Sequence, residues 1–250
     1  MGAVREHGLD RAIQVFECLH EAREPLPIGE VARRLRAPRS TIYNIVNRFV
    51  EAEILETRDS DGAVFFGRTL YFYGINYLKK NDRLRRAREE IDRMAERIQE
   101  TVEYGALQGN KYTTVHMYAG ASVLKISSIV GERVPIPWTA VGRLLLVGKD
   151  AEEIRAFIPE EDFILPDGRT ICFEEFCQDI DRARKAGFCL TTGLINSFTK
   201  CLAVPVYEDG GVPTNAICAV VAIDTPQHRI DELLVLLKKS ADFLSSDIIS

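Results

Sequence analysis

The sequence lacks the features that would place it in a membrane, outside the cell or among zinc proteins. No apolar run approaches the roughly 20 residues needed to span a bilayer, and the first residues lack the apolar segment of a signal peptide. The six cysteines and four histidines are scattered, without a Cys-x-x-Cys pair. This spacing disfavours a metal site or a disulfide framework and favours free thiols in a reducing compartment. We therefore expect a cytoplasmic protein without a cofactor.

Catalytic motifs are missing as well. The sequence contains no G-x-S-x-G, H-E-x-x-H or G-x-G-x-x-G. The stretch from Gly142 to Lys149 is too long for a phosphate loop, and Asp150 stands where a magnesium-binding hydroxyl is needed. Cys201 is a candidate nucleophile, but its apolar neighbours predict a buried strand and no histidine is near it in sequence. For Cys172 and Cys177, which could meet in space, burial as small apolar side chains is favoured. We predict no enzymatic activity, and a hydrolase remains the least favoured alternative.

What the sequence does contain is one basic island in an acidic chain. Overall there are 37 Asp and Glu against 32 Lys and Arg, a net charge of −5. Residues 31–50, VARRLRAPRSTIYNIVNRFV, carry five arginines and no acid. A local positive face in an acidic protein indicates a polyanionic partner, and two helices separated by Ala37 and Pro38 suggest duplex DNA.

The apolar periodicity around this island predicts a winged helix-turn-helix. Helices are expected over residues 8–21 and 28–35, and a third begins at Pro38, because proline suits the first position of a helix. Two short strands, residues 54–58 and 63–66, flank an Asp-Gly turn and predict a hairpin, which is the wing.

The third helix has one apolar face and one polar face. Ile42, Ile45, Val46, Phe49 and Val50 share the apolar face. A solvated surface would explain the polar face equally well for an isolated helix, but the three-helix layout and the wing favour DNA reading. The predicted DNA contacts are Arg39, Ser40, Thr41, Tyr43, Asn44, Asn47 and Arg48 on the helix and Arg58 on the wing. The island's other three arginines are expected to grip phosphates or to pair with acids.

Residues 70–101 are long, charged and helical in pattern, and we predict a single linker helix. Its arginines precede acids on adjacent turns, so pairing along a solvated helix explains them better than DNA contact. Its apolar stripe must pack on the second domain or on another protomer. Because a major-groove reader normally binds paired half-sites, we expect a homodimer or a dimer of dimers.

Residues 102–250 mix strands with helices, which predicts an α+β sandwich rather than a doubly wound nucleotide fold. The expected strands are residues 101–107, 112–119, 122–129, 201–207 and 217–223, and a polar loop is expected over 208–215. The expected helices are residues 139–147, 173–185 and 230–246.

Several segments resemble the isocitrate lyase regulator (IclR) family. GLDRAIQVFECLHEAREPLPIGEVARRLRAPRSTIYNIVNRFVEAEIL resembles the family's DNA-binding domain. VGERVPIPWTAVGRLLL, KAGFCLTTGLINSFTKCLAVPVYEDGG and ICAVVAIDTPQHRI resemble its effector-binding domain, which has a GAF/PAS-like fold. The resemblance implies a winged helix over residues 1–69, a linker helix over 70–101 and an effector-binding and oligomerisation domain over 102–250. Asn44 stands where the family commonly has arginine, so the operator sequence is not transferable.

The resemblance also implies an effector pocket in the second domain, and the aliphatic members of its lining double as core. The implied lining is Val123, Ile126, Val134, Ala140, Val141, Thr191, Cys201, Ala222 and Asp224. Residues 190–193 lack the family's usual acids, and Ala222 and Asp224 align where two serines are common. A carboxylate in place of a hydroxyl opposes an anionic ligand. We predict a neutral, hydroxylated or amine-bearing effector, or an acid held by backbone amides around Ala140.

Together these patterns predict a transcription regulator whose operator affinity is controlled by a small metabolite. The alternative is an interaction module whose winged helix binds protein and whose second domain only dimerises. Salt-dependent binding to duplex DNA distinguishes the two, because phosphate contacts make affinity fall steeply with salt.

Overall fold

The computed structural model describes residues 8–58, 62–121, 128–208 and 211–246. The chain divides into two compact units, Met1–Asp82 and Arg83–Ser250. Within the described residues, no helix combines the length and the apolar character needed to cross a membrane. Each unit has its own buried core.

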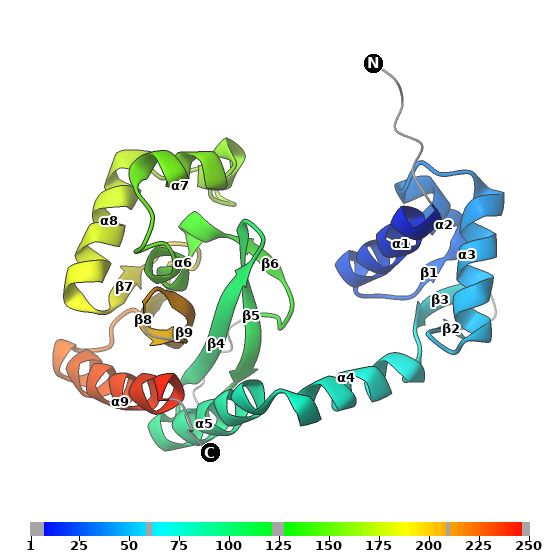
Figure 1. Ribbon diagram of the computed structural model, residues 1–250. Helices are drawn as coiled ribbons and strands as arrows, with labels where there is room; N and C mark the ends of the chain where they lie inside the picture. The colour runs from blue at the N-terminus through cyan, green and yellow to red at the C-terminus, as the bar shows by residue number, and fades with distance from the viewer. Residues whose placement is uncertain (1–7, 59–61, 122–127, 209–210, 247–250) are drawn as a thin grey trace. The chain divides into compact units, whose positions relative to one another are not determined.

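The N-terminal unit is the predicted winged helix-turn-helix (Figure 1). Its helices are α1 (Gly8–Ala22), α2 (Ile28–Arg34), α3 (Arg39–Glu51) and α4 (Arg68–Lys80). Its antiparallel sheet has the order β1-β3-β2, formed by β1 (Leu26–Pro27), β3 (Ala63–Phe66) and β2 (Leu55–Arg58). Strand β1 was not predicted, because two residues are too short to show a period; Leu26 pairs with Val64. The turn of the wing, residues 59–61, lies outside the described residues.

The core of this unit explains which face of α3 is exposed. Ile42 and Val46 of α3 are completely buried, together with Val15 and Leu19 of α1. Phe49, one turn further along α3, meets Phe16 edge-on, with ring centroids 4.8 Å apart. The predicted apolar face of the third helix is therefore the buried one, and the polar face is left to solvent.

The predicted single linker helix is two helices in the structure, α4 and α5 (Asp82–Ile98). Asn81 separates them, with φ −108° and ψ 82°, outside the helical region. Asparagine and aspartate favour helix ends because their side chains compete with the backbone for hydrogen bonds, and here Asn81 and Asp82 are adjacent. Helix α5 buries the predicted apolar stripe against the second domain, whereas all 13 residues of α4 are described and none is buried.

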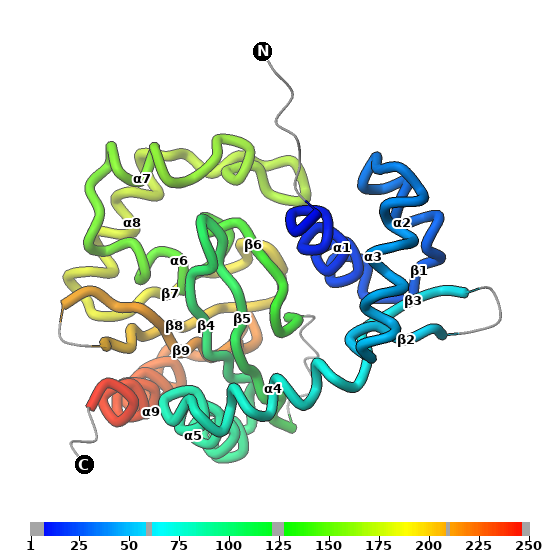
Figure 2. Tube along the Cα trace, turned by 45° about the vertical axis from the view of Figure 1, so that its right-hand side comes forward, coloured from blue at the N-terminus to red at the C-terminus, as the bar shows by residue number. Residues whose placement is uncertain are grey.

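The C-terminal unit is built on one six-stranded antiparallel sheet with the order β6-β5-β4-β9-β8-β7. Helices α5 and α9 (Gln227–Ser245) cover one face, and α6 (Ala140–Leu145) packs over β8 and β9 on the other (Figures 1 and 2). The strands are β4 (Thr101–Gln108), β5 (Lys111–Tyr118), β6 (Arg133–Pro135), β7 (Cys189–Thr192), β8 (Thr199–Tyr207) and β9 (Pro213–Ala222). Helices α7 (Ala151–Phe157) and α8 (Phe173–Ala186) and the short 3-10 helices Ile136–Trp138 and Glu160–Phe163 complete this second layer. The predicted α+β class with a GAF/PAS-like second domain is confirmed.

Some predictions for this unit were wrong in detail. The predicted strand over 122–129 lies mostly outside the described residues, and Ser128 and Ile129 are not in a strand. Strands β6 and β7 and helix α7 were not predicted, and β9 begins at Pro213, inside the predicted loop. Cys172 is exposed rather than buried, Cys177 is half-buried, and all six cysteines are free.

Replacement of Ile42 by alanine tests the assignment of the buried face of α3. Because Ile42 is completely buried, Ile42→Ala should reduce the unfolding free energy of the N-terminal unit by about 2–5 kcal/mol. Far-UV circular dichroism should show loss of helix at a lower urea concentration than in the wild type. Fluorescence of Trp138, the single tryptophan, should show unfolding of the C-terminal unit at the same urea concentration as in the wild type. The control is Tyr43→Ala, on the exposed face. Equal losses in both variants would show that α3 is rotated from this orientation.

Candidate functional site

The exposed face of α3 presents the side chains that the sequence predicts as DNA contacts. Arg39, Ser40, Asn44, Asn47 and Arg48 are exposed, Thr41 is half-buried, and Tyr43 is 44% exposed. Asparagine and arginine are suited to bidentate contact with adenine and guanine, and hydroxyl groups to phosphate. This face therefore carries side chains suited to contact base edges and the phosphate groups of duplex DNA.

The beginning of α3 is open to an anion. Pro38 is the N-cap rather than the first helical residue, so α3 begins one residue later than predicted, and no described side chain caps the helix. The first amides of a helix have no partner within it and carry the positive end of the helix dipole. Arg39 stands next to them and forms no ion pair with any residue of the described ranges.

Most of the island's other arginines are paired with acids. Arg33 and Arg34 both donate to Glu30, at 2.7 and 2.8 Å, and these hydrogen bonds lower the pKa of Glu30 to about 2. Arg48 lies 3.0 Å from Glu51, and Arg58, exposed at the end of β2, pairs with Glu56. The prediction that some arginines pair with acids is confirmed for Arg33 and Arg34. Exposed pairs of this kind are weak, so a phosphate can compete for the arginines.

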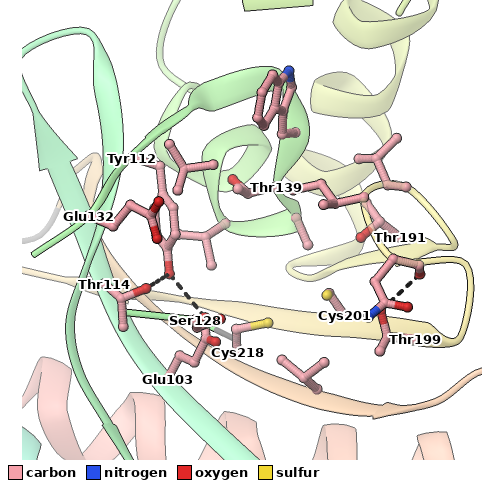
Figure 3. Close-up of a pocket in the computed structure, with 18 of the residues that line it drawn as sticks. Glu103, Tyr112, Thr114, Ser128, Glu132, Thr139, Thr191, Thr199, Cys201 and Cys218 are labelled. Carbon is pink, nitrogen blue, oxygen red and sulfur yellow. Dashed lines mark hydrogen bonds between the residues drawn. The ribbon is translucent and has the colours of Figure 1, made fainter. Parts of the chain in front are cut away.

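The C-terminal unit contains a cavity of about 310 Å3 between the sheet and the α6 layer. Figure 3 shows Glu103, Tyr112, Thr114 and Ser128 on one side of it and Thr191, Thr199 and Cys201 on the other. The apolar part of the lining comes from Ile129, Val134, Trp138, Ala140, Val141, Leu194, Ile195 and Val220. The remaining described lining residues are Glu132, Thr139, Gly193, Asn196 and Cys218.

The alternation of β4 places a carboxyl group in this cavity. Val102 and Tyr104 belong to the core beneath α5 and α9, so Glu103 between them points to the opposite face, where it lines the cavity. Its neighbour on that face is Gly105, where a Cβ would come within 2.3 Å of the Tyr112 ring. Glycine at 105 therefore lets Tyr112 lie across β4, where its hydroxyl donates to Glu103 Oε2 at 3.3 Å.

Burial dominates the electrostatics of this group. Glu103 is 6% exposed, and burial raises the pKa of its carboxyl, opposed by hydrogen bonds from Ser128 and Tyr112. Burial also raises the pKa of Tyr112 well above its usual range. The Thr114 hydroxyl lies 3.2 Å from that of Tyr112 and extends the network. The second oxygen, Oε1, is buried without a hydrogen-bond partner.

The opposite wall is held by a buried arginine. Arg143 of α6 is 3% exposed; its guanidinium donates to the Pro137 and Thr139 carbonyls at 3.0 and 2.8 Å and to Asp179 at 3.1 Å. At Gly142 a Cβ would lie 2.3 Å from the Ile136 carbonyl oxygen, so only glycine allows this close approach. These contacts fix the turn that carries Trp138 and Thr139. Because Thr139 Oγ1 accepts from the Gly142 amide at 2.8 Å, that amide is not free for a ligand carboxylate.

The predicted pocket lining is partly brought together. Val134, Ala140, Val141, Thr191 and Cys201 line the cavity, whereas Val123 and Ile126 lie outside the described residues. Ala222 and Asp224 do not line it: Ala222 ends β9 and Asp224 is exposed in the turn beyond. The side chains of β9 that reach the cavity are Cys218 and Val220, because β9 starts earlier than predicted and its centre crosses the pocket.

The most polar part of the pocket was missed. Glu103, Tyr112 and Ser128 were not among the predicted residues, although an acid alternating with apolar residues in TVEYGAL is a signal that could have found Glu103. The carboxylate that opposes an anionic ligand is thus Glu103 rather than Asp224.

Two buried cysteines of the second domain, Cys189 and Cys218, are poor nucleophiles. A hydrogen bond with Cys201, reinforced by burial, raises the pKa of the Cys218 thiol well above its usual range. Burial raises the pKa of Cys189 to about 11. Thiols held protonated react slowly, since the thiolate is the nucleophile. In the described part of the chain, no group of three or more His, Cys, Asp or Glu side chains is placed to hold a metal ion.

Comparison with known proteins yields matches to both units. The model of the "Bacterial transcriptional regulator IclR C-terminal" domain matches residues 75–246, and that of the "IclR helix-turn-helix domain" matches residues 8–59. The HTH-type transcriptional regulator KdgR of Dickeya chrysanthemi is 25% identical over 219 residues, 87% of this chain and 70% of that protein.

Solved structures have the same fold. An IclR transcriptional regulator from Alicyclobacillus acidocaldarius superposes with a TM-score of 0.84 at 19% identity, covering 97% of this chain and 98% of that one. An IclR homologue from Microbacterium hydrocarbonoxydans, complexed with 4-hydroxybenzoate, gives 0.82 at 22% identity, covering 96% and 98%.

The raised pKa of Glu103 predicts a pH-dependent stability. An acid whose pKa is higher in the folded state contributes stability below its unfolded pKa, about 4.3, and loses it as pH rises through the folded pKa. Glu103→Gln removes the titrating group and keeps the shape. The variant should melt at a higher temperature than the wild type at pH 8, by a margin that shrinks toward pH 4, as followed by Trp138 fluorescence. A difference that does not change with pH would contradict the burial of a titrating carboxyl.

Proposed function

Because this chain belongs to the IclR family of bacterial transcriptional regulators, we propose that the exposed face of α3 reads its operator and that a small molecule in the C-terminal cavity sets the operator affinity. The protein is a helix-turn-helix transcription regulator with a C-terminal effector-binding domain. Its relatives are named as regulators and not as enzymes. A regulator acts where the chromosome is, so the bacterial cytoplasm is its proposed location.

The separation of buried and exposed residues on α3 carries the DNA part of the proposal. Ile42 and Val46 are needed by the core, while Asn44 and Asn47 contribute nothing to it and are exposed. Polar side chains that a core does not require, next to uncapped helix amides and Arg39, fit a helix in the major groove. Arg58 on the wing would contact the neighbouring backbone.

The cavity carries the effector part. Its volume of about 310 Å3 falls at the lower end of the range of small-molecule sites, about 300–1,000 Å3. It mixes apolar walls with a few hydroxyl and carboxyl groups, which is the usual composition of a ligand site. The relative crystallised with 4-hydroxybenzoate supports a small-molecule effector here.

Strand β4 offers a physical link between the cavity and α5. Glu103 faces the cavity, and the adjacent Val102 and Tyr104 pack in the core with Ile91 and Met94 of α5. On the same face of the sheet, Asp92 of α5 meets His116 at 2.7 Å. A ligand that moves β4 would therefore shift α5, which continues through Asn81 into α4. Such coupling requires a ligand that binds the two states with different affinity.

Helix α4 supports a homodimer formed with a second copy of the chain. Tyr71, Phe72, Tyr73 and Tyr77 are between 55% and 66% exposed. Four neighbouring exposed aromatic side chains are unusual on a free surface, and a symmetric partner would cover them while pairing two reading helices.

The DNA assignment is tested by Arg39→Ala combined with Asn44→Ala. Loss of a base contact and a phosphate contact should weaken binding to a duplex selected from random sequences by about tenfold or more. The slope of affinity against salt should also fall by about one, because one phosphate contact is lost. Gel shift and fluorescence anisotropy provide the measurement, and Arg182→Ala on α8 is the control. Unchanged binding would refute the reading helix, and duplex binding absent from the wild type would favour the interaction-module alternative.

Substitutions on α4 test whether this helix forms the dimer interface. Tyr73→Glu with Tyr77→Glu puts two charges on adjacent turns of the aromatic surface, and should weaken self-association by about tenfold or more, as measured by sedimentation velocity. Lys79→Glu on the same helix is the control for added acid. A double variant that sediments like the wild type at every concentration would remove α4 from the interface.

A further inference from the structure

The cavity contains a buried acceptor that the protein itself leaves unsatisfied. Glu103 Oε2 accepts from Tyr112, but Oε1 has no hydrogen-bond partner, although it is shielded from solvent. An unpaired buried acceptor costs free energy, and the cost is larger for a charged group. Such groups are few in folded proteins, and strain, a catalytic role, a water molecule or an ion usually accounts for them.

No positively charged side chain is found among the described residues that line the cavity around Glu103. The only charged side chains among the described lining residues are two acids, Glu103 and Glu132. Arg143, a buried cation of α6, is held by Asp179 and two backbone carbonyls and does not line the cavity. A ligand carboxylate entering this space would meet like charge and lose its hydration, two effects that act in the same direction.

We propose that the carboxyl group of Glu103 binds the ammonium group of a small primary amine, with the rest of the ligand lying against Val134, Val141 and Val220. This assignment rests on the proposed function, since it names the chemistry of the same pocket. An ammonium group supplies both the missing donor and the opposite charge, and charge-assisted hydrogen bonds are about twice as strong as neutral ones. A ligand hydroxyl supplies only the donor and leaves the carboxylate uncompensated.

The opposite side of the cavity suits the rest of such a ligand. Thr191 and Thr199 lie across the cavity from Glu103 in Figure 3. Asn196 also lines the cavity, so the body of the ligand has hydroxyl and amide groups within the same space. Trp138 also lines the cavity and offers an aromatic surface. The cavity of about 310 Å3 fits a molecule the size of phenethylamine.

Three probes of one shape and different charge test the assignment on the full chain. Phenethylamine, 2-phenylethanol and phenylacetate are titrated at pH 7.5, followed by Trp138 fluorescence and by calorimetry. Phenethylamine should bind about tenfold more tightly than 2-phenylethanol, because the charged contact exceeds the neutral one. Phenylacetate should bind most weakly. Two further amines vary the rest of the molecule: tyramine adds a hydroxyl group to the aromatic ring, and butylamine replaces the ring by an aliphatic chain.

Two matched variants assign the contact to one carboxyl group. Glu103→Gln keeps the shape and removes the charge, so phenethylamine should bind about tenfold or more weakly while 2-phenylethanol changes by less than about threefold. Glu175→Gln, the same change at an exposed acid of α8 that does not line the cavity, should affect phenethylamine by less than about threefold. Melting curves of both variants confirm that they are folded.

Several results would overturn the assignment. It fails if phenylacetate binds more tightly than phenethylamine, if Glu103→Gln weakens all three probes equally, or if none of the three amines binds saturably. Val141→Trp, which fills the cavity, separates this failure from failure of the proposed function. If phenylacetate binds the wild type but not Val141→Trp, the pocket remains a ligand site and only the amine assignment is lost. If the amines bind but never change duplex affinity, the amine assignment stands and control of the operator is lost.

Discussion

The period-two alternation of β4 is the constraint on which the second domain depends. One face of this strand presents Val102 and Tyr104 to the core under α5 and α9, and the other presents Glu103 to the cavity. A shift by one residue would bury the carboxyl in the apolar core, which is costly, and expose the core residues to the cavity. Because of this alternation, one face of β4 forms part of the pocket wall and its other face packs against α5.

A buried arginine holds the opposite wall of the pocket in place. Arg143 ties α6, the preceding turn and α8 together through the carbonyls of Pro137 and Thr139 and through Asp179. The guanidinium also lies over the Phe176 ring, 5.0 Å from its centroid. Under the proposed function, a ligand held between this wall and β4 would act on β4, and through the far face of that strand on α5. Between α5 and the exposed aromatic helix α4, the backbone of Asn81 lies outside the helical region.

Sequence patterns predicted the parts with strong local periodicity. The three helices and hairpin of the winged helix follow from the spacing of residues such as Ile42, Val46 and Leu55, which a small core leaves no freedom to displace. Long-range strand pairing was harder to predict, and the short edge strands β6 and β7 were missed. Ala222 and Asp224 were wrongly predicted to line the pocket, because β9 begins before its apolar run. The alternation in TVEYGAL marks Glu103 as an acid on one face of β4, but it does not show that this face lines a pocket. Glu103 becomes a site only when β5, β8 and β9 close around it.

The central claim is that occupancy of the cavity beside β4 changes the affinity of α3 for DNA. Its most direct test is the affinity of the full chain for a selected duplex, with and without saturating phenethylamine, in the wild type and in Val141→Trp. We expect a change of about fivefold or more in the wild type, typical of allosteric coupling, and none in the variant. Ligand binding reported by Trp138 without any change in duplex affinity would contradict it.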